Sequence, residues 1–438
     1  MNTDKNQLPA GQTLVLGLQH MFAMFGATVT VPLITGLDIG TTLLMAGLGT
    51  LLFHLITGGK VPAFLGSSFA FLGGYAAITS LAGTEGFEEM TKAQLLPYAC
   101  LGVACAGLVY LVLAGLIKAF GIKKVMRCFP PIVTGPIIIA IGLGLAPVAV
   151  GSCKANWTLA LTALAVIGIC NIWGKGMIRI IPILIGLVVS YALACCLGAV
   201  DFTAVKSAAW IGLPIHKANT ILGVDFAKGG LISSAIIAIV PIALATIMEH
   251  IGDISAISST VGKDFITDPG LHRTLTGDGL ATTFASIFGG PANTTYGENT
   301  GVLALSRVFN PVVIRVAAVF AILLSFCPKF AAVISTIPGP IVGGISFVLY
   351  GMISAVGIRN LVENKVDFSK SRNLIIAAVI LVTALGGVTL PIGSTGAALT
   401  PLALASLAGI VLNAIFPAGD YAAHAKEDEP PKGNTFEV

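Results

Sequence analysis

Long apolar blocks separated by short polar stretches fill most of this chain of 438 residues. Within blocks such as 95–119 and 230–254, apolar residues run on instead of alternating with polar ones. Runs of about 20 apolar residues are typical of transmembrane helices, whereas the strands of a membrane barrel alternate. The pattern therefore predicts an all-α integral membrane protein. Fourteen candidate spans lie at about 13–35, 40–58, 62–82, 95–119, 129–150, 156–173, 177–199, 230–254, 273–289, 293–308, 311–328, 331–355, 372–390 and 397–417.

The third and tenth candidate spans differ from the others because they are short, polar and rich in glycine. The tenth contains GGPANTTYGENTG at 289–301, and its counterpart in the third is 64–71. Non-helical backbone survives at membrane depth only where it is buried in protein or lines a cavity. We therefore predict two interrupted segments, each with a short extended stretch leading into a half-helix. The second half-helix should begin near Tyr296 or Gly297, and both should aim backbone N–H groups at one pocket.

Short motifs recur in the same order in the two halves of the chain. Because seven spans is an odd number, a second copy of seven must be inverted in the membrane, and paired interrupted segments in inverted repeats mark the binding site of transporters. We predict repeats at 1–210 and 229–417. The matched pairs are Gln19-His20 with Glu249-His250, Pro62-Ala63 with Pro291-Ala292, and Gly135-Pro136 with Gly339-Pro340.

The distribution of positive charge predicts the orientation. If both termini and the even-numbered loops share one side, that side holds 18 of the 24 Lys and Arg residues. Cytoplasmic loops of membrane proteins carry an excess of Lys and Arg. Both termini are therefore expected in the cytoplasm. The charged, Pro-containing tail at 418–438 is expected to be disordered.

Composition excludes several other classes of protein. Hydrophobic residues make up 55% of the chain and charged residues 10%, against about 25% charged in soluble domains. The net charge of +4 forms no basic patch outside short loops, so we expect no nucleic-acid partner. The eight cysteines form no CxxC pair, which argues against a metal site, a disulfide framework or a bound cofactor. No GxxxxGK[ST] loop is present, so the protein is not expected to be an ATP-driven pump.

Four carboxylates at or near membrane depth are the candidates for chemistry. Glu249 and Asp253 lie four residues apart on one helical face, and Glu298 lies in the tenth span. An acid inside a membrane is costly and by default functional, and burial lets it exchange a proton near neutral pH. The alternative is that each acid only satisfies a neighbouring donor. Asp278, between two glycines near the start of the ninth span, is interpreted as a cap or turn residue.

Aromatic residues in or near the interrupted segments suggest a planar ligand. Phe69 stands out because it lies inside the first broken segment beside Ser68. Tyr296 lies in the second broken segment, and Tyr350 follows that segment in the chain. Their alternative role is ordinary packing. A flat aromatic surface combined with carboxylates suits a planar molecule with N–H donors and disfavours an anion. For His20 and His250, packing is the preferred interpretation.

These motifs resemble the nucleobase/ascorbate transporter family, and the resemblance runs from about residue 12 to about 416. The family signature reads here as Glu298-Asn299-Thr300-Gly301 followed by Ser306-Arg307. Purine-transporting relatives typically have Gln at the position of Glu298, so Glu indicates the uracil branch. The other segments that carry the resemblance are LQHMFAMFGATVTVP, KVPAFLGSSFAF, EHIGD, DPGLHRTLTGDG and FVLYGMI.

The resemblance implies a uracil:proton symporter that works by alternating access and is not an enzyme. It implies a core domain of spans 1–4 and 8–11, a gate domain of spans 5–7 and 12–14, and a homodimer through the gate. Some relatives have His where this chain has Asp253, which leaves the proton carrier open among Glu249, Asp253 and Glu298. The residues expected to bind substrate are Ala27, Ser68, Phe69, Glu249, Tyr296, Gly297, Glu298 and Tyr350.

Two other functions remain open from the sequence. A purine or broad nucleobase permease would share the architecture and would be revealed by competition with xanthine. An anion exchanger of the same architecture is disfavoured by the acidic pocket. No paired nucleophile and base supports a membrane enzyme.

Overall fold

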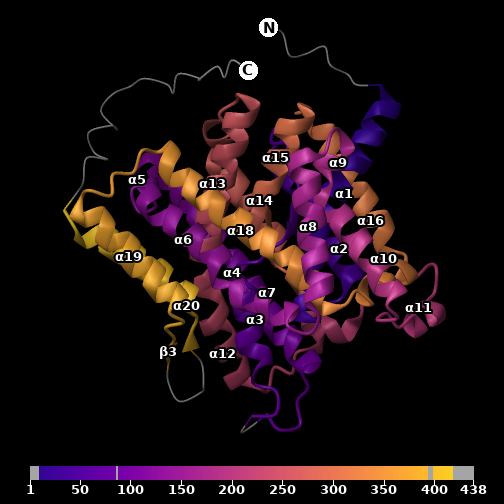
Figure 1. Ribbon diagram of the computed structural model, residues 1–438. Coiled ribbons are helices and arrows are strands. Elements are labelled where there is room, and N and C mark those ends of the chain that lie inside the picture. Colours follow the sequence, from indigo (N-terminus) through magenta and orange to yellow (C-terminus); the bar gives the residue numbers. More distant parts are fainter. Residues whose placement is uncertain (1–8, 85–86, 393–397, 418–438) are drawn as a thin grey trace.

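The computed structural model describes residues 9–84, 87–392 and 398–417, and these residues are almost entirely helical (Figure 1). The predicted tail at 418–438 lies outside them. The first half contains α1 (Ala10–Thr35), α2 (Ile39–Ile56), β1 (Leu65–Ser67), α3 (Leu72–Thr79), α4 (Lys92–Phe120), α5 (Ile122–Met126), α6 (Pro131–Gly144), α7 (Ala146–Cys153), α8 (Trp157–Trp173), α9 (Met177–Ile180), α10 (Pro182–Cys196) and α11 (Thr203–Ser207).

Two short 3-10 turns, η2 (Lys217–Asn219) and η3 (Ile221–Gly223), precede the second half. The second half contains α12 (Gly229–Ile239), η4 (Val240–Ile242), α13 (Ala243–Val261), η5 (Ile266–Gly270), α14 (Leu271–Ile287), β2 (Asn293–Thr295), α15 (Gly297–Ser306), α16 (Pro311–Ser325), α17 (Pro328–Ser335), α18 (Gly339–Glu363), α19 (Ser371–Leu385), β3 (Leu390–Pro391), β4 (Ala398–Leu399) and α20 (Pro401–Ile415).

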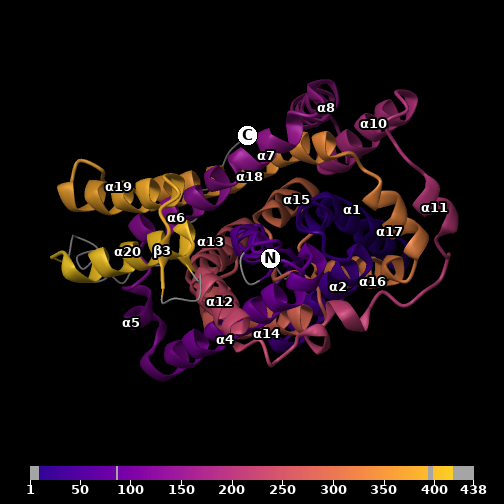
Figure 2. The same cartoon turned by 90° about the horizontal axis from the view of Figure 1, so that it is seen from below.

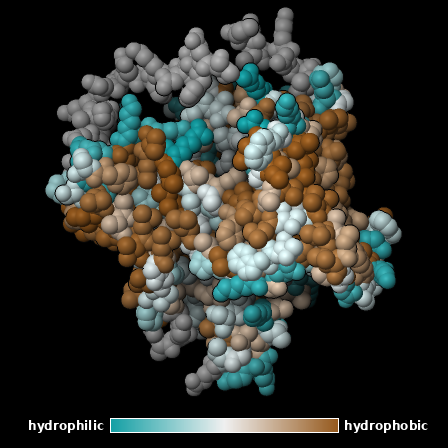
Figure 3. All heavy atoms as spheres, in the orientation of Figure 1, coloured by the Kyte–Doolittle hydropathy of each residue, from teal (hydrophilic) through white to brown (hydrophobic). Residues whose placement is uncertain are grey.

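Several of these helices are long and apolar enough to cross a membrane. Among the described residues there are 6, or up to 7 if the bent pair α16 and α17 counts as one span. Four shorter apolar helices, α8, α10, α19 and α20, have 10–17 residues. In Figure 3, apolar residues cover the middle of both flanks, and hydrophilic residues gather toward the upper and lower ends. The protein is thus a multi-pass helical membrane protein. The count of fourteen spans stays a prediction.

One predicted span is divided differently in the structure. The twelfth was expected at 331–355, but α17 ends at Ser335, and α18 begins at Gly339 and continues to Glu363. The axes of α16 and α17 meet at 88°. Prolines explain both boundaries, since Pro328 begins α17 and Pro338 immediately precedes α18. A proline has no N–H to donate and suits the first turn of a helix.

The helices pack in two groups. In the first group, α14 packs against α2 and α4, and α16 packs against α1 and α2. In the second group, α18 packs against α6, α7 and α8, and α19 packs against α6 and α20. Figure 2 shows α18, α7 and α8 along one side of the molecule and α1, α2 and α16 on the other. The interrupted segments belong to the first group, and the second group faces them through α18.

The two strands β1 and β2 meet in the interior of the protein. They pair antiparallel, with Leu65 opposite Thr295 and Ser67 opposite Asn293. All their residues are buried. The strands are only three residues long, so buried backbone beyond the ladder needs side-chain partners. Neighbouring side chains supply them, because Thr50 Oγ1 accepts a hydrogen bond from Leu65 N at 2.9 Å and Asn299 Nδ2 donates to Pro62 O at 2.8 Å.

Candidate functional site

A short helix follows each interior strand, after one residue in the case of β2 and after four residues in the case of β1. After β2, α15 starts at Gly297, as the glycine-rich sequence predicted, and the side chain of its N-cap residue Tyr296 makes no capping hydrogen bond. After β1, α3 starts at Leu72. The first N–H groups of a helix have no intrahelical partner and carry partial positive charge. The start of α15 therefore offers hydrogen-bond donors to whatever occupies the space in front of it.

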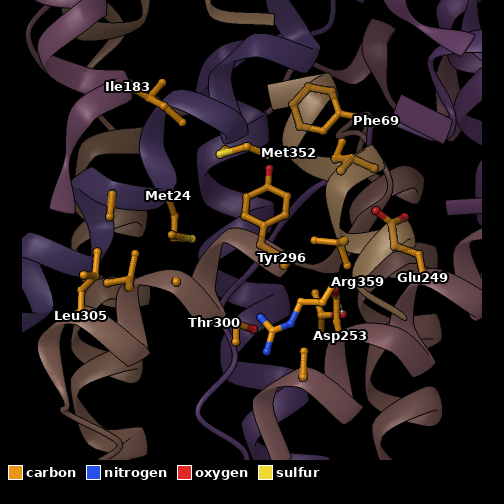
Figure 4. A pocket seen from close by; sticks show the side chains of 18 of the residues that line it. Met24, Phe69, Ile183, Glu249, Asp253, Tyr296, Thr300, Leu305, Met352 and Arg359 are labelled. Carbon is orange, nitrogen blue, oxygen red and sulfur yellow. Dashed lines mark hydrogen bonds between the residues drawn. The ribbon is translucent and has the colours of Figure 1, made fainter. Parts of the chain in front are cut away.

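A cavity of about 280 Å³ lies in front of α15. In Figure 4, the apolar residues Met24, Ile183 and Leu305 lie on one side and Phe69, Glu249 and Asp253 on the other. The lining residues come from both groups of helices and are Ala23, Met24, Phe69, Ile138, Asn171, Arg179, Ile180, Pro182, Ile183, Glu249, Asp253, Ala256, Thr294, Thr295, Tyr296, Gly297, Thr300, Gly301, Val302, Leu305, Met352, Ile353, Val356 and Arg359.

The two carboxylates of α13 reach the cavity from the same helical face. Asp253 is 2% exposed, and its Oδ2 accepts a hydrogen bond from Thr295 Oγ1 at 3.1 Å. A Cβ added at Gly297 would lie 3.1 Å from Asp253 Oδ1. The Asp253 carboxylate therefore lies beside the N-terminus of α15, where the helix dipole favours negative charge. Glu249 lines the same cavity one helical turn earlier.

Aromatic side chains lie beside the carboxylates of the cavity. Phe69 packs edge-on against Tyr350, with ring centroids 5.6 Å apart and planes at 77°. Tyr296 lines the cavity, is 3% exposed and donates a hydrogen bond from its hydroxyl to Ser67 O at 3.1 Å. The cavity thus combines ring surfaces with acceptors on α13 and donors on α15. Such a combination suits a planar molecule that carries both N–H and C=O groups.

The structure brings most of the expected site residues together. Phe69, Glu249, Asp253, Tyr296 and Gly297 line the cavity. Three others are buried but do not line it, namely Ala27, Ser68 and Tyr350. Ser68 instead contributes its backbone N–H to Ala292 O at 2.8 Å, and Tyr350 supports the ring of Phe69. The side chain of Glu298 lies outside what the structure describes, so its role stays a prediction.

Sequence reasoning missed the two arginines of the cavity. Arg179 and Arg359 line it from the second group of helices, and the sequence analysis counted both only as positive loop charges. Arg359 Nε lies 2.6 Å from Glu363 Oε1, and the Arg359 side chain is 54% exposed. The cavity therefore reaches the surface at this end. The only signal in the sequence was the positive-charge bias itself, which does not reveal which loop arginines approach the pocket.

One sequence interpretation concerning α14 was wrong. Asp278 is neither a cap nor a turn residue, because α14 begins at Leu271 and Asp278 is fully buried within it. The glycines on either side permit close packing of helices, since added Cβ atoms at Gly277 and Gly279 would meet Phe53 and Tyr110 at 2.8 and 2.5 Å. His250 is buried, as its interpretation as a packing residue expects, and its Nδ1 lies 3.0 Å from Asp278 Oδ2.

Replacing Gly66 of β1 with alanine is expected to disturb the cavity. An added Cβ there would lie 2.4–2.6 Å from ring atoms of Tyr296, which is buried and cannot yield freely. Overpacking of this kind costs about 1–3 kcal/mol, so we expect a lower thermal unfolding midpoint. The matched control is Gly73→Ala in α3, where no atom lies within 4 Å of the added Cβ. Equal midpoints for the two variants would contradict the close packing of Tyr296 on β1.

The fold matches a known class of membrane transporter domain. The transmembrane domain of the cyanobacterial bicarbonate transporter BicA superposes with a TM-score of 0.60 at 15% identity, covering 92% of this chain and 97% of that one. At this identity the likeness shows the fold alone. The fold and the cavity define the class as a multi-pass helical membrane protein with an internal cavity between two groups of helices.

Sequence relatives narrow the class to a family. A model described as "Permease family" matches residues 11–393. The uracil permease of Bacillus caldolyticus is 43% identical, over 94% of this chain and 94% of its own. The uracil permease of Escherichia coli K12 is 41% identical, over 93% of this chain and 92% of its own. The chain belongs to the nucleobase/ascorbate transporter family, and it is therefore a transporter rather than an enzyme.

Proposed function

We propose that the protein imports uracil together with protons across the bacterial cytoplasmic membrane. The observation that carries this proposal is the cavity in which the Glu249 carboxylate, the Phe69 ring and the N-terminus of α15 converge. Uracil is a planar ring with N–H donors and carbonyl acceptors. The carboxylate matches its N–H groups and the backbone N–H groups of α15 match its carbonyls. The names of the relatives from Bacillus caldolyticus and Escherichia coli support the same substrate.

The proposed mechanism is alternating access between two rigid groups of helices. The core domain (spans 1–4 and 8–11) carries the interrupted segments, and the gate domain (spans 5–7 and 12–14) rocks against it, with a homodimer formed through the gate. The cavity contains Arg179 and the half-exposed Arg359, both on the side that the charge bias assigns to the cytoplasm. The described conformation is therefore taken as inward-facing, with both termini in the cytoplasm.

Proton coupling is assigned to the cavity acids Glu249 and Asp253, together with Glu298. Asp253 accepts a hydrogen bond from Thr295 and lines the cavity, so it can exchange a proton with water that enters from the cytoplasm. A carboxylate that takes up a proton outside and releases it inside would link the proton gradient to transport of a neutral substrate. Uracil has no net charge, so the proton is the only charge that crosses the membrane in the proposed symport.

A direct binding measurement tests the substrate. Purified protein in detergent should bind labelled uracil, and unlabelled uracil should displace it far better than xanthine or chloride. Displacement by xanthine at equal or lower concentration would favour a purine permease over a uracil permease. Bicarbonate or chloride that displaces uracil would favour the anion exchanger whose class is represented by the BicA fold.

A further inference from the structure

Behind the cavity, a histidine and an aspartate face each other in the protein interior. His250 Nδ1 of α13 lies 3.0 Å from Asp278 Oδ2 of α14, and both side chains are 0% exposed. Among the described residues, His250 Nε2 has no hydrogen-bond partner, whereas Thr294 of β2 interacts with the Asp278 carboxylate. A charge buried in this way is costly unless an opposite charge or a proton neutralises it. One proton added to the imidazole converts the pair from a net negative charge to a neutral ion pair.

A single hydroxyl group connects this pair to the cavity. Thr295 Oγ1 of β2 lies 3.3 Å from His250 Nδ1 and 3.1 Å from Asp253 Oδ2. Asp253 lines the cavity, whereas His250 and Asp278 do not. The four groups thus form a chain of contacts that runs from the cavity surface to a fully enclosed pair. The pairing of β1 with β2 fixes Thr295, since Thr295 is opposite Leu65 in the register.

We propose that His250 and Asp278 form a second proton site, which exchanges a proton with Asp253 through the Thr295 hydroxyl. This inference rests on the proposed proton coupling and adds a location for the proton outside the cavity. In the first state, the protonated Asp253 donates to Thr295 Oγ1, and the Thr295 hydroxyl donates to His250 Nδ1. In the second state, the single His250 Nδ1–H is shared between Asp278 Oδ2 at 3.0 Å and Thr295 Oγ1 at 3.3 Å, and the hydroxyl donates to the Asp253 carboxylate. One O–H bond breaks on Asp253, one N–H bond forms on His250, and the threonine exchanges one proton for another.

The surroundings of the pair favour storage of a single proton. Three elements other than α13 and α14 face the pair. Tyr110 of α4 lies within electrostatic reach of Asp278 and Glu249, and Phe53 of α2 packs edge-on against the His250 ring at 6.4 Å. The third element, β2, contributes Thr294 beside Asp278 and Thr295 beside His250. On α13 itself, Glu249 and Asp253 are the nearby acids. In the described part of the chain, no Lys or Arg forms an ion pair with Asp278. The imidazole is therefore the group there that can take a positive charge.

Transport measurements on full-length protein in proteoliposomes test this relay. The readout is the ratio of uracil accumulation under an inward proton gradient to uracil exchange without a gradient. A gradient of one pH unit can drive up to about tenfold accumulation with one proton per uracil. We expect His250→Gln and Asp278→Asn to reduce that accumulation to about onefold. Thr295→Val should lower the ratio in the same way, whereas Thr295→Ser, which keeps the hydroxyl, should retain the wild-type ratio.

A matched histidine control separates the relay from general damage. His54 of α2 is also buried, but its Nε2 contacts the backbone oxygen of Ala63 at 3.0 Å, away from the chain of proton carriers. His54→Gln should keep the wild-type ratio. A wild-type ratio in His250→Gln, or equal ratios for Thr295→Val and Thr295→Ser, would overturn the proposal. The isosteric Asp278→Asn provides the same test if His250→Gln does not fold.

Infrared spectroscopy of the uracil-free protein distinguishes failure of the relay from failure of the proposed function. Acid-minus-alkaline difference spectra should contain imidazole bands that disappear in His250→Gln and carboxyl bands that change in Asp278→Asn. Unchanged spectra in both variants would overturn the second proton site. If wild-type protein transports uracil without responding to the gradient, the proposed symport fails, while the spectra still decide whether the pair binds a proton.

Discussion

Glu249→Gln is expected to reduce uracil binding and transport by about 10-fold to about 100-fold, because a hydrogen bond to a charged group contributes about 1.5–3 kcal/mol. Glu249 lines the cavity from α13, where its carboxylate has two acceptor oxygens for the N–H groups of uracil. Glutamine keeps the shape but replaces one acceptor with a donor that would face another donor. The measurement is equilibrium binding of labelled uracil, followed by initial uptake rates at low uracil concentration.

The matched control for this substitution is Glu363→Gln on α18. Glu363 pairs with Arg359 at 2.6 Å, but its side chain is 50% exposed and does not line the cavity. Exposed ion pairs contribute about 0–1 kcal/mol, so uracil affinity should stay close to that of the wild type. Wild-type affinity in Glu249→Gln would contradict the assignment of this carboxylate to the substrate.

Asp253→Asn is expected to abolish gradient-driven accumulation while exchange of uracil continues. Asparagine cannot carry the proton, but its carbonyl oxygen can still accept the hydrogen bond that Thr295 donates to Asp253 Oδ2. The local structure at β2 should therefore persist. Under a gradient of one pH unit, accumulation should fall from up to about tenfold to about onefold. The measurement compares accumulation with counterflow exchange in the same proteoliposomes.

This result would separate Asp253 from Glu249. Loss of exchange together with accumulation in Asp253→Asn would place Asp253 among the substrate-binding groups. Full accumulation by the same variant would transfer proton coupling to Glu249 or Glu298. Asp253 Oδ1 lies close to the start of α15, 3.1 Å from a Cβ added at Gly297. A change in uracil affinity of less than tenfold is therefore compatible with a role of Asp253 in proton coupling.

The short extended stretches at β1 and β2 could be predicted from the sequence, because glycine, proline and polar residues within a long apolar stretch have few structural explanations. That these stretches interrupt membrane spans stays a prediction. The sequence placed the start of the second half-helix near Tyr296 or Gly297, and α15 begins at Gly297. The same signals failed where one residue type has two uses. Gly277 and Gly279 resembled a turn, but in α14 they permit Phe53 and Tyr110 to pack closely. Local sequence does not distinguish these uses, because the contacting helices are distant in the chain.

Which residues line the cavity also depends on contacts between distant parts of the chain, and no local sequence pattern reveals these contacts. Phe69, Glu249 and Tyr296 could be selected from residue type and place in the repeat. Arg359 could not, because its approach to the cavity depends on how α18 packs against the interrupted segments. The contact between His250 and Asp278 likewise depends on the register between α13 and α14. Ala27 and Tyr350 are buried and do not line the cavity, so their contact with substrate stays a prediction.

Uptake of labelled uracil into proteoliposomes under an imposed inward proton gradient, with and without an uncoupler, tests the central claim most directly. The account predicts that uracil accumulates above its external concentration and that the uncoupler collapses this accumulation to equilibrium. Uptake that only equilibrates and ignores the gradient would contradict proton coupling. Folded protein that takes up no uracil would contradict the assigned substrate.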